Sequence, residues 1–340
     1  MRSSGEKTRV LLTGATGFVG SHALEALDTC PDVELVAAVR DPRRLLPGFK
    51  GEVRRGDLRD PRYVDAIVRD VQVVVHAGTW SSLFSHRQES RELFLKPALA
   101  LIDAAVRQGV SRFINISTTS AAAPDCAEDP NSRGIPRYFW PHLTNIVRIE
   151  NHMRNHSTWA TTMVNLRCGI FVGQRYGLGV LPILLPRLRT HLVPWVGGGR
   201  TRLPLVDGRD IAQAIVHAVR QPQLAGYEGF NIVGPYSPTV RELIDFLHSE
   251  FGYPRPHFSV PFGAAYLFAW LMEKLDRVLP GDPLITRSIV HLLEETGATN
   301  ERASAVLGYR PQHDWQESVR LQVAELHRRQ RRPMALARPV

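Results

Sequence analysis

Three glycines at intervals of three residues, Gly14, Gly17 and Gly20, follow an apolar run in the segment TGATGFVG. The first position permits a tight turn, the second lets backbone N–H groups approach a pyrophosphate, and the third allows a helix to pack closely on a sheet. The N-terminus of that helix would face the phosphate charge. The pattern predicts a strand, a turn and a helix that bind a dinucleotide, with a purely structural glycine turn as the alternative. The expected contacts are Gly14, Thr16, Gly17, Phe18, Val19 and Gly20.

Strand and helix patterns alternate through the first half of the chain. The runs RVLLTG, ELVAAVR, VQVVVHAG, SRFINIS and ATTMVNLR are almost continuous in apolar residues, which is typical of strands buried on both faces. Helical periodicity lies between them, for example over residues 97–108. This alternation predicts an α/β fold, a Rossmann-type doubly wound parallel sheet with helices on both faces.

Glycine and proline become frequent after Cys168, which indicates a change in organisation. We interpret residues 1–167, with contributions from 205–235, as the dinucleotide-binding domain. Residues 168–204 and 236–330 would form a smaller, interwoven substrate-binding lobe, and 331–340 a basic tail. Further helices are expected over residues 210–220, 241–251, 264–275 and 282–295.

The end of the second predicted strand indicates which dinucleotide is bound. Arg40 stands 20 residues after Gly20, where an acidic residue would accept the ribose 2′-hydroxyl of NAD. A guanidinium suits the 2′-phosphate of NADP instead, and Arg43 and Arg44 would add charge. NADPH is therefore the expected cofactor. The alternative is that these arginines are only solvated at the surface, above all Arg43 and Arg44.

Asp57 follows the third predicted strand in the segment RGDLRD. Its carboxylate is expected to accept the adenine amino group, with Leu58 against the face of the ring. A turn in which Asp57 caps the next helix is the alternative.

Composition limits the partners and the location of the protein. The formal net charge is +9, but the sequence has no basic stripe interleaved with aromatic residues, so no nucleic-acid partner is expected. The cysteines are few, odd in number and far apart, at Cys30, Cys126 and Cys168, so we expect neither a disulfide framework nor a metal site. Together with an N-terminus without an apolar signal-peptide core, this usage predicts a cytoplasmic protein.

The longest uncharged run covers residues 256–272 and is interrupted by Pro261 and Gly263. It is short for a helix that spans a membrane. We interpret it as a buried or lid helix, with contact to a membrane interface as the alternative.

The order of the motifs resembles that of the extended short-chain dehydrogenases/reductases over nearly the whole chain. The segments that carry the resemblance are TGATGFVG, GDL, HAG, GVSRFINIST, LRCGIFVG, VDGRDIAQAI, GFNIVG and LGYRP. The second half, with VPFGAAYLFAWLMEKL and DPLITRSIVHLLEE, is most similar to the 3β-hydroxysteroid dehydrogenase branch. This resemblance implies a polycyclic, largely apolar substrate.

In that family a Ser or Thr, a Tyr and a Lys four residues after the Tyr act together on a carbonyl. The resemblance places the hydroxyl at Thr118. Glu150 sets the register of the following helix, which puts His142 at the Tyr position and Ile146 at the Lys position. The asparagine that often completes the proton relay aligns with Phe94. Of this group, the chain therefore retains only the hydroxyl.

Tyr138 offers an alternative register, one helical turn before His142. Its spacing from Thr118 is short, and the only basic residue four positions after it is His142 itself. His142 could also merely line or cap the pocket, because it follows Pro141 in the first turn of the helix.

A substrate that carries its own acid could replace the missing Tyr. A phenol next to an aromatic ketone already hydrogen-bonds the carbonyl, and a well-oriented intramolecular group reaches effective molarities of about 10⁵ M or more. These features resemble the atypical angucyclinone ketoreductases of aromatic polyketide biosynthesis. We expect an NADPH-dependent ketoreductase of this kind. The alternatives are a steroid-dehydrogenase-like enzyme that uses His142 as its acid, and a non-catalytic NADP-binding sensor or scaffold.

Loops at the ends of the strands supply the remaining candidates. Cofactor contacts are expected at Ala77, Gly78, Thr79 and Ser117, and substrate contacts at Trp80, Ser81, Thr119, Ser120 and Tyr176. Cys168 and Gly169 are expected to pack where the backbone of the family meets the nicotinamide.

Many relatives form dimers through two helices of the cofactor domain. The helix over residues 141–155 is rich in polar side chains, namely His142, Thr144, Asn145, Arg148, Asn151, His152 and Arg154. This polarity would weaken such a dimer face, so a monomer is favoured.

Overall fold

The computed structural model describes residues 7–122, 127–276, 283 and 285–331. Its centre is a seven-stranded parallel sheet in the order β10-β6-β5-β4-β1-β2-β3. The strands are β1 (Thr8–Thr13), β2 (Val33–Val39), β3 (Glu52–Arg55), β4 (Val73–His76), β5 (Arg112–Thr118), β6 (Thr162–Cys168) and β10 (Tyr227–Ile232). The predicted doubly wound α/β fold is confirmed.

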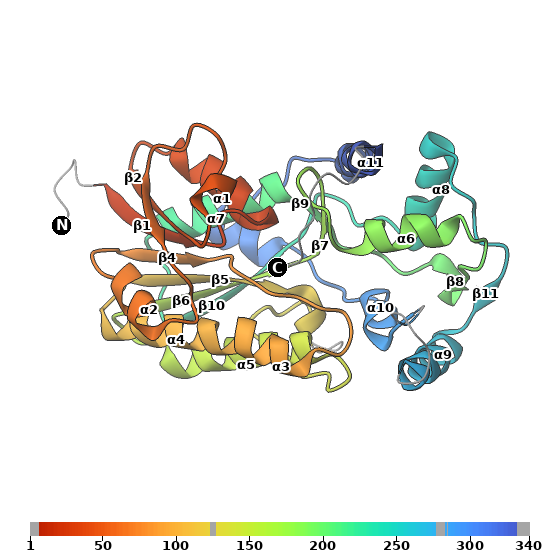
Figure 1. Cartoon of the computed structure of the whole chain (residues 1–340), viewed down its shortest axis with the longest axis horizontal. Coiled ribbons are helices and arrows are strands. Elements are labelled where there is room, and N and C mark those ends of the chain that lie inside the picture. Colours follow the sequence, from red (N-terminus) through yellow and green to blue (C-terminus); the bar gives the residue numbers. More distant parts are fainter. Residues whose placement is uncertain (1–6, 123–126, 277–282, 284, 332–340) are drawn as a thin grey trace.

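Helices cover both faces of this sheet (Figure 1). One face carries α1 (Phe18–Asp28) and α7 (Gly208–Arg220), and the other carries α2 (Pro61–Ile67), α4 (Lys96–Arg107) and α5 (Pro141–His156). A short helix, α3 (Arg87–Ser90), and a π-helical turn over Arg91–Leu95 precede α4.

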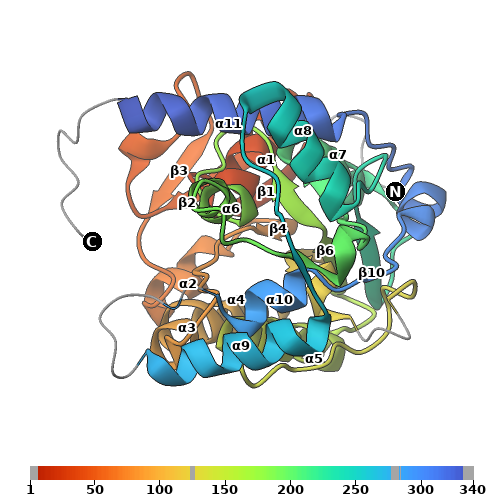
Figure 2. The ribbon, with the colours of Figure 1, turned by 90° about the vertical axis from the view of Figure 1, so that its right-hand side faces the viewer.

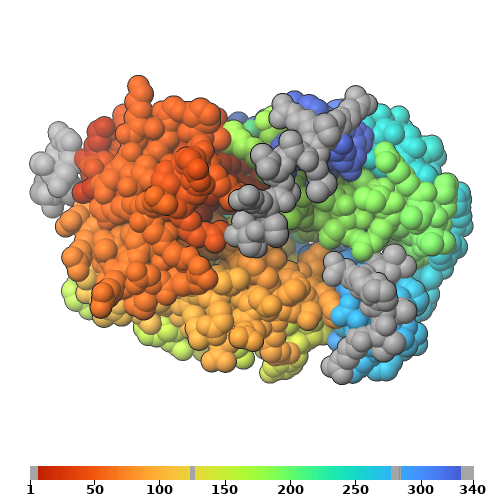
Figure 3. All heavy atoms as spheres, in the orientation of Figure 1, coloured from red at the N-terminus to blue at the C-terminus, as the bar shows by residue number. Residues whose placement is uncertain are grey.

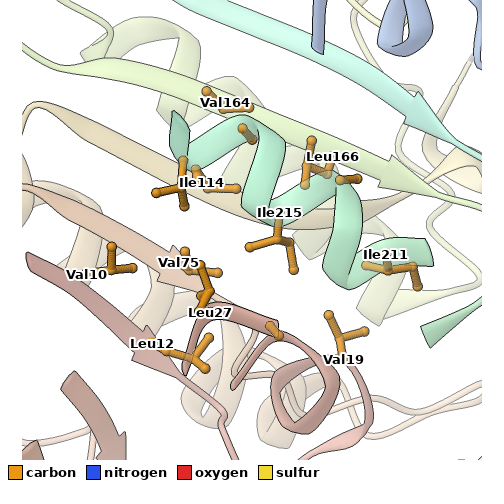
Figure 4. Packing of buried hydrophobic residues seen from close by; sticks show 14 of the residues in the cluster. Val10, Leu12, Val19, Leu27, Val75, Ile114, Val164, Leu166, Ile211 and Ile215 are labelled. Atoms are coloured by element: carbon orange, nitrogen blue, oxygen red, sulfur yellow. The ribbon is translucent and has the colours of Figure 1, made fainter. Parts of the chain in front are cut away.

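The apolar strand sequences explain the two layers. Successive side chains of a strand point to opposite faces, so Val73 and Val75 of β4 join the core beneath α1 and α7, whereas Val74 joins the core beneath α2 and α4. Ile211 and Ile215 of α7 point toward the sheet from one side of the helix (Figure 4).

A second lobe forms beyond β6, on the opposite side of the molecule from the N-terminal strands (Figures 1 and 3), and it faces the viewer in Figure 2. The chain returns to the sheet through α7 and β10 before it leaves again. The other elements are β7 (Ile170–Val172), α6 (Val180–Leu188), β8 (Trp195–Val196), β9 (Leu205–Asp207), α8 (Val240–Phe251), β11 (Ser259–Val260), α9 (Phe262–Leu275), α10 (Arg287–Leu292) and α11 (Trp315–Arg331). Short 3₁₀ turns lie at Pro42–Arg44, Thr119–Ala121 and Gly197–Gly199, and a second π-helical turn at Ala303–Leu307.

Two helices of this lobe differ from the sequence predictions. Residues 282–295 were expected to be helical, but α10 begins only at Arg287 because the backbone of Thr286 is extended. Residues 256–272 were expected to form a buried or lid helix. The helix, α9, begins at Phe262, and the expectation that it is buried is wrong, because only Ala265 and Ala269 of α9 are buried. Leu267, Phe268, Trp270 and Leu271 expose large apolar side chains.

Among the residues that the structure describes, no helix is both long and apolar enough to cross a membrane. Cys126, Asp282 and residues 332–340 of the predicted basic tail lie outside the described residues.

Candidate active site

The glycine loop after β1 has a backbone that other residues could not adopt. Gly14 has φ of +72°, and a Cβ there would lie 2.5 Å from the backbone nitrogen of Gly78. A Cβ on Gly20 would lie 2.1 Å from the carbonyl oxygen of Gly14. Helix α1 begins at Phe18, so its first backbone N–H groups face the loop. This tight cradle at a helix N-terminus fits the pyrophosphate of a dinucleotide.

Charged residues lie close together just after the carboxyl ends of β2 and β3. Arg40 is exposed directly after β2, and its charge helps to lower the pKa of Asp57, which is lowered first by hydrogen bonds from Arg59. Asp57 is therefore a carboxylate at neutral pH and close to Arg40. The alternative in which Asp57 caps the next helix is wrong, because Asp60 caps α2.

The two neighbouring arginines differ in their surroundings. Arg43 lies at the surface and donates to Asp41 from Nε over 2.9 Å, so part of its charge is already neutralised. Arg44 is also exposed. Arg40 is therefore the better placed of the three for a phosphate that binds beside Asp57.

The loop after β4 lies directly against the glycine loop, since a Cβ on Gly14 would also touch Ala77. Behind it, His76 is buried and its Nδ1 lies 2.8 Å from Oγ1 of Thr13. Burial lowers the pKa of His76 to about 4. Ala77 and Gly78, which are expected to contact the cofactor, thus border the cradle. His76 was not predicted, because a histidine at a strand end carries no distinctive sequence signal.

The end of β5 positions two hydroxyl groups differently. Oγ1 of Thr118 accepts a hydrogen bond from the backbone N–H of Ser120 over 3.2 Å, which leaves the hydroxyl hydrogen of Thr118 able to be donated. Oγ of Ser117 instead donates to Glu150 over 2.6 Å in the core. A cofactor contact from Ser117 would therefore have to come from its backbone. Thr119 and Ser120 follow in a buried 3₁₀ turn.

Helix α5 carries His142 and Ile146, which the sequence analysis expects at the Tyr and Lys positions of the family. Glu150 is fully buried and pairs with Arg167 of β6, with Nη2 and Oε2 2.6 Å apart. His142, Ile146 and Glu150 are four residues apart and share one face of the helix. Because Glu150 contacts Ser117 and α5 runs antiparallel to β5, His142 lies about 12 Å farther along, beyond the carboxyl end of the strand.

His142 is buried, and its ring centre lies 4.7 Å from that of Phe94. The two residues expected at the family's Tyr and Asn positions are thus in contact. Burial lowers the pKa of His142 to about 4. Its Nδ1 is buried and has no hydrogen-bond partner among the described residues. His142 is therefore a neutral imidazole at physiological pH, and no carboxylate among the residues that the structure describes bonds to it.

The structure contradicts the alternative register with Tyr138. Helix α5 begins at Pro141, so Tyr138 lies in the preceding turn rather than on the helix. Its side chain is 72% exposed. Without burial, Tyr138 lacks the fixed geometry that a proton donor needs.

The expected substrate contacts lie in different places. Ser81 is exposed, and the ring of Trp80 lies 5.9 Å from that of His86 in the loop after β4. Tyr176 packs instead on Phe18 of the glycine loop, with ring centres 4.5 Å apart. Cys168 is buried, and Gly169 packs so closely on Pro204 that a Cβ would lie 1.9 Å from its carbonyl oxygen.

Helix α10 reaches these loops from the second lobe. Nε2 of His291 lies 3.2 Å from the carbonyl oxygen of Ser120, to which it can donate. Oγ of Ser288 donates to the carbonyl of Leu83, and Nε1 of Trp140 donates to Ser82 over 2.8 Å. The sequence holds no signal for these residues, because each contact joins segments that are far apart in the chain.

Comparison with known proteins adds to this geometry. The sequence profile of the NAD dependent epimerase/dehydratase family matches residues 10–233. A 2-alkyl-3-oxoalkanoate reductase from Stenotrophomonas maltophilia is 26% identical over 331 residues, which cover 92% of this chain and 97% of the reductase. The hybrid PKS-NRPS synthetase poxE from Penicillium oxalicum is 34% identical over 249 residues, which cover 70% of this chain and 6% of the synthetase. The chain thus spans a small part of that relative.

Among solved structures, MoeE5 in complex with UDP-glucuronic acid and NAD has the same fold. The TM-score is 0.68 at 19% identity, and the match covers 95% of this chain and 99% of MoeE5. Seven parallel strands, the glycine cradle and the family profile agree on a nicotinamide dinucleotide as the cofactor.

Proposed function

This chain belongs to the NAD dependent epimerase/dehydratase family and is a nicotinamide-dependent oxidoreductase, and we propose that it is an NADPH-dependent ketoreductase. The proposed substrate is a polycyclic aromatic ketone of the angucyclinone type with a phenol next to the carbonyl. In this proposal the phenol supplies the proton that a tyrosine supplies in other members. The simocyclinone C-7 ketoreductase, which the sequence resembles, represents this class.

The observation that carries the proposal is the state of His142. A general acid works best when its pKa is near the operating pH. Burial lowers the pKa of His142 to about 4, and no cationic group stands four residues later, where the helix has Ile146. The chain thus places a weak donor at the position of the acid, which favours a proton from the substrate.

The residues of the chain would bind and orient both partners. The glycine loop holds the pyrophosphate, and Arg40 and Asp57 hold the adenosine end. Reduced nicotinamide, when bound, supplies a hydride to the carbonyl carbon. Thr118 donates a hydrogen bond to the substrate oxygen and keeps the phenol proton aligned with it. The buried rings of Phe94 and His142, which pack on each other, would help to exclude water.

Arg40 supports NADPH over NADH. A guanidinium binds a phosphate with two parallel hydrogen bonds, whereas a ribose hydroxyl offers it no charge. Its exposure after β2 leaves it accessible to the 2′-phosphate. The 26% identical relative, named as a reductase of 2-alkyl-3-oxoalkanoates, supports carbonyl reduction, and the match to a hybrid PKS-NRPS synthetase supports a polyketide substrate.

The test compares two substrates that differ only in the phenol. NADPH oxidation is measured with a polycyclic aromatic ketone that has a free adjacent phenol, and with its O-methyl ether. We expect turnover of the phenol and a rate at least about 10²-fold lower for the ether, since a positioned acid contributes roughly 10² to 10⁴. Fluorescence titrations with NADPH and NADH on the same protein compare the two dissociation constants.

Controls separate the competing functions. Tyr138→Phe is expected to leave both rates unchanged. If the ether reacts as fast as the phenol and His142→Phe abolishes both activities, His142 is the acid and the proposal is wrong. If NADPH binds but neither ketone reacts, a sensor or scaffold role replaces the ketoreductase.

A further inference from the structure

Helices α4 and α5 lie side by side on the sheet face away from α1 and α7 (Figures 1 and 2). His152 and His156 are one turn apart at the end of α5, and Asp103 faces them from α4. None of the three belongs to the proposed active site. Their ligand atoms all lie within 4.8 Å of one another.

The distances within this cluster are close to those of a metal site. Nε2 of His152 lies 2.6 Å from Oδ1 of Asp103, and Nε2 of His156 lies 3.9 Å from the same oxygen. Two ligands of a tetrahedral Zn²⁺ with bonds of about 2.0–2.1 Å are roughly 3.3 Å apart. Movements of under 1 Å at the side-chain tips would bring each histidine to that separation from Asp103. The two imidazole rings, whose centres lie 3.9 Å apart at an angle of 30°, would also have to turn toward the ion.

The backbone orients His156 for such a role. Its Nδ1 lies 2.9 Å from the carbonyl oxygen of His152 and can donate to it. With the proton on Nδ1, the lone pair of Nε2 faces Asp103. Histidines that bind metals are commonly held in this way by a hydrogen bond from the other ring nitrogen.

The cluster is also accessible. The side chains of Asp103 and His156 are each 39% exposed, and that of His152 is 23% exposed. A hydrated ion can therefore enter, and a solvent molecule can fill the remaining position.

A second pair of histidines, His191 and His257, lies elsewhere at the surface. Their rings are stacked, with Nδ1 and Nε2 3.2 Å apart, so a substitution there is a matched control for a substitution in the proposed metal site.

We propose that Asp103, His152 and His156 bind one Zn²⁺ ion per chain, with water as the fourth ligand. Two imidazoles and one carboxylate are a ligand set that Zn²⁺ accepts, and three protein ligands leave one open position. The ion joins α4 to α5, so it stabilises the helix that carries His142 without touching the active site.

The test uses the full chain after treatment with a chelator. Zn²⁺ is titrated calorimetrically at pH 7.5, and Co²⁺ is added to a second sample to record the visible absorption that tetrahedral coordination gives. We expect one ion per chain, and at least about a tenfold weaker affinity for His156→Ala and for Asp103→Asn. Zn²⁺ at 100 times its dissociation constant raises the melting temperature of the original chain, since a ligand that binds only the folded state stabilises it.

Two comparisons make the result decisive. His257→Ala is expected to retain the same stoichiometry, affinity and Co²⁺ spectrum as the original chain. Circular dichroism confirms that each variant is folded before it is titrated. The proposal is overturned if the original chain binds no Zn²⁺ at 100 µM, or if His156→Ala and Asp103→Asn, both folded, bind as tightly as the original chain.

Discussion

Two histidines near the carboxyl edge of the sheet, His76 and His142, lie in surroundings that exclude water. Burial lowers the pKa of each from its ordinary value of 6.5 to about 4. Between these values the unfolded chain binds a proton at each histidine that the folded chain does not bind. The free energy of unfolding is therefore expected to fall as the pH drops from about 6.5 to 4, and to be unaffected by these groups above that window.

The first prediction isolates the contribution of His142. His142→Phe removes one of the two groups, so its free energy of unfolding should fall less between pH 7 and pH 5 than that of the original chain. The difference should be about 2 kcal/mol, since one pKa unit corresponds to about 1.4 kcal/mol. Urea unfolding at both pH values measures it. If both proteins lost the same free energy of unfolding, the pKa of His142 would not be lowered by folding. The argument that His142 is a poor proton donor would then fail.

At the scale of elements, α5 is held on the sheet by a buried polar network. Glu150 accepts hydrogen bonds from Ser117 of β5, from Asn165 over 2.8 Å and from Arg167 of β6. The Arg167 side chain is fully buried, and although burial opposes it, hydrogen bonding to Glu150 keeps the pKa of Arg167 raised. This network sets the register of the helix and therefore the position of His142.

The second prediction removes the charge at the centre of this network. Glu150→Gln is expected to destabilise the fold by about 3–5 kcal/mol, because it leaves the guanidinium of Arg167 buried without a counter-charge. Glu250→Gln provides the control: its exposed pair with Arg320, 2.9 Å apart, should matter little. Chemical unfolding of both variants gives the comparison. A similar small effect at both positions would show that the buried pair does not anchor α5.

At the scale of the whole molecule, the second lobe contacts the loops of the active site through α10. His291 can donate to the carbonyl of Ser120, two residues after Thr118, and its Nδ1 lies 2.6 Å from Oε2 of Glu294. Ser288 holds the loop after β4 at Leu83. Residues of both lobes therefore hold the loops around the expected ketone site. The glycine loop, in contrast, directly follows β1 of the sheet.

The third prediction follows from this division. His291→Ala should raise KM for the phenolic ketone about fivefold, as expected for a lost hydrogen bond of about 1 kcal/mol. The dissociation constant of NADPH should not change. Tyr236→Phe, which removes a 2.8 Å hydrogen bond to Glu242 within the second lobe, is the matched control and should leave both values unchanged. Equal weakening of ketone and cofactor binding in His291→Ala would contradict a selective role of α10.

Local chemistry explains how much of the fold and of the cofactor site the sequence predicts. The glycine spacing predicts a turn that the structure confirms at Gly14 and Gly20, because positive φ and missing side-chain volume are properties of single residues. Apolar runs predict the parallel strands, since each strand of a doubly wound sheet is buried on both faces. Helix ends were less accurate, as at α10, where the extended backbone of Thr286 delays the start.

The sequence by itself therefore determined the fold class and the glycine turn of the dinucleotide cradle, whereas the contact between His142 and Phe94 came from the structure. Only the tertiary structure decided that Tyr138 is exposed, that Ser117 turns into the core, that α9 exposes an apolar face and that Asp103 meets His152. The physical reason is the range of the interactions. Turns and periodic burial depend on neighbours in the chain, whereas burial and side-chain contacts depend on how distant segments pack together.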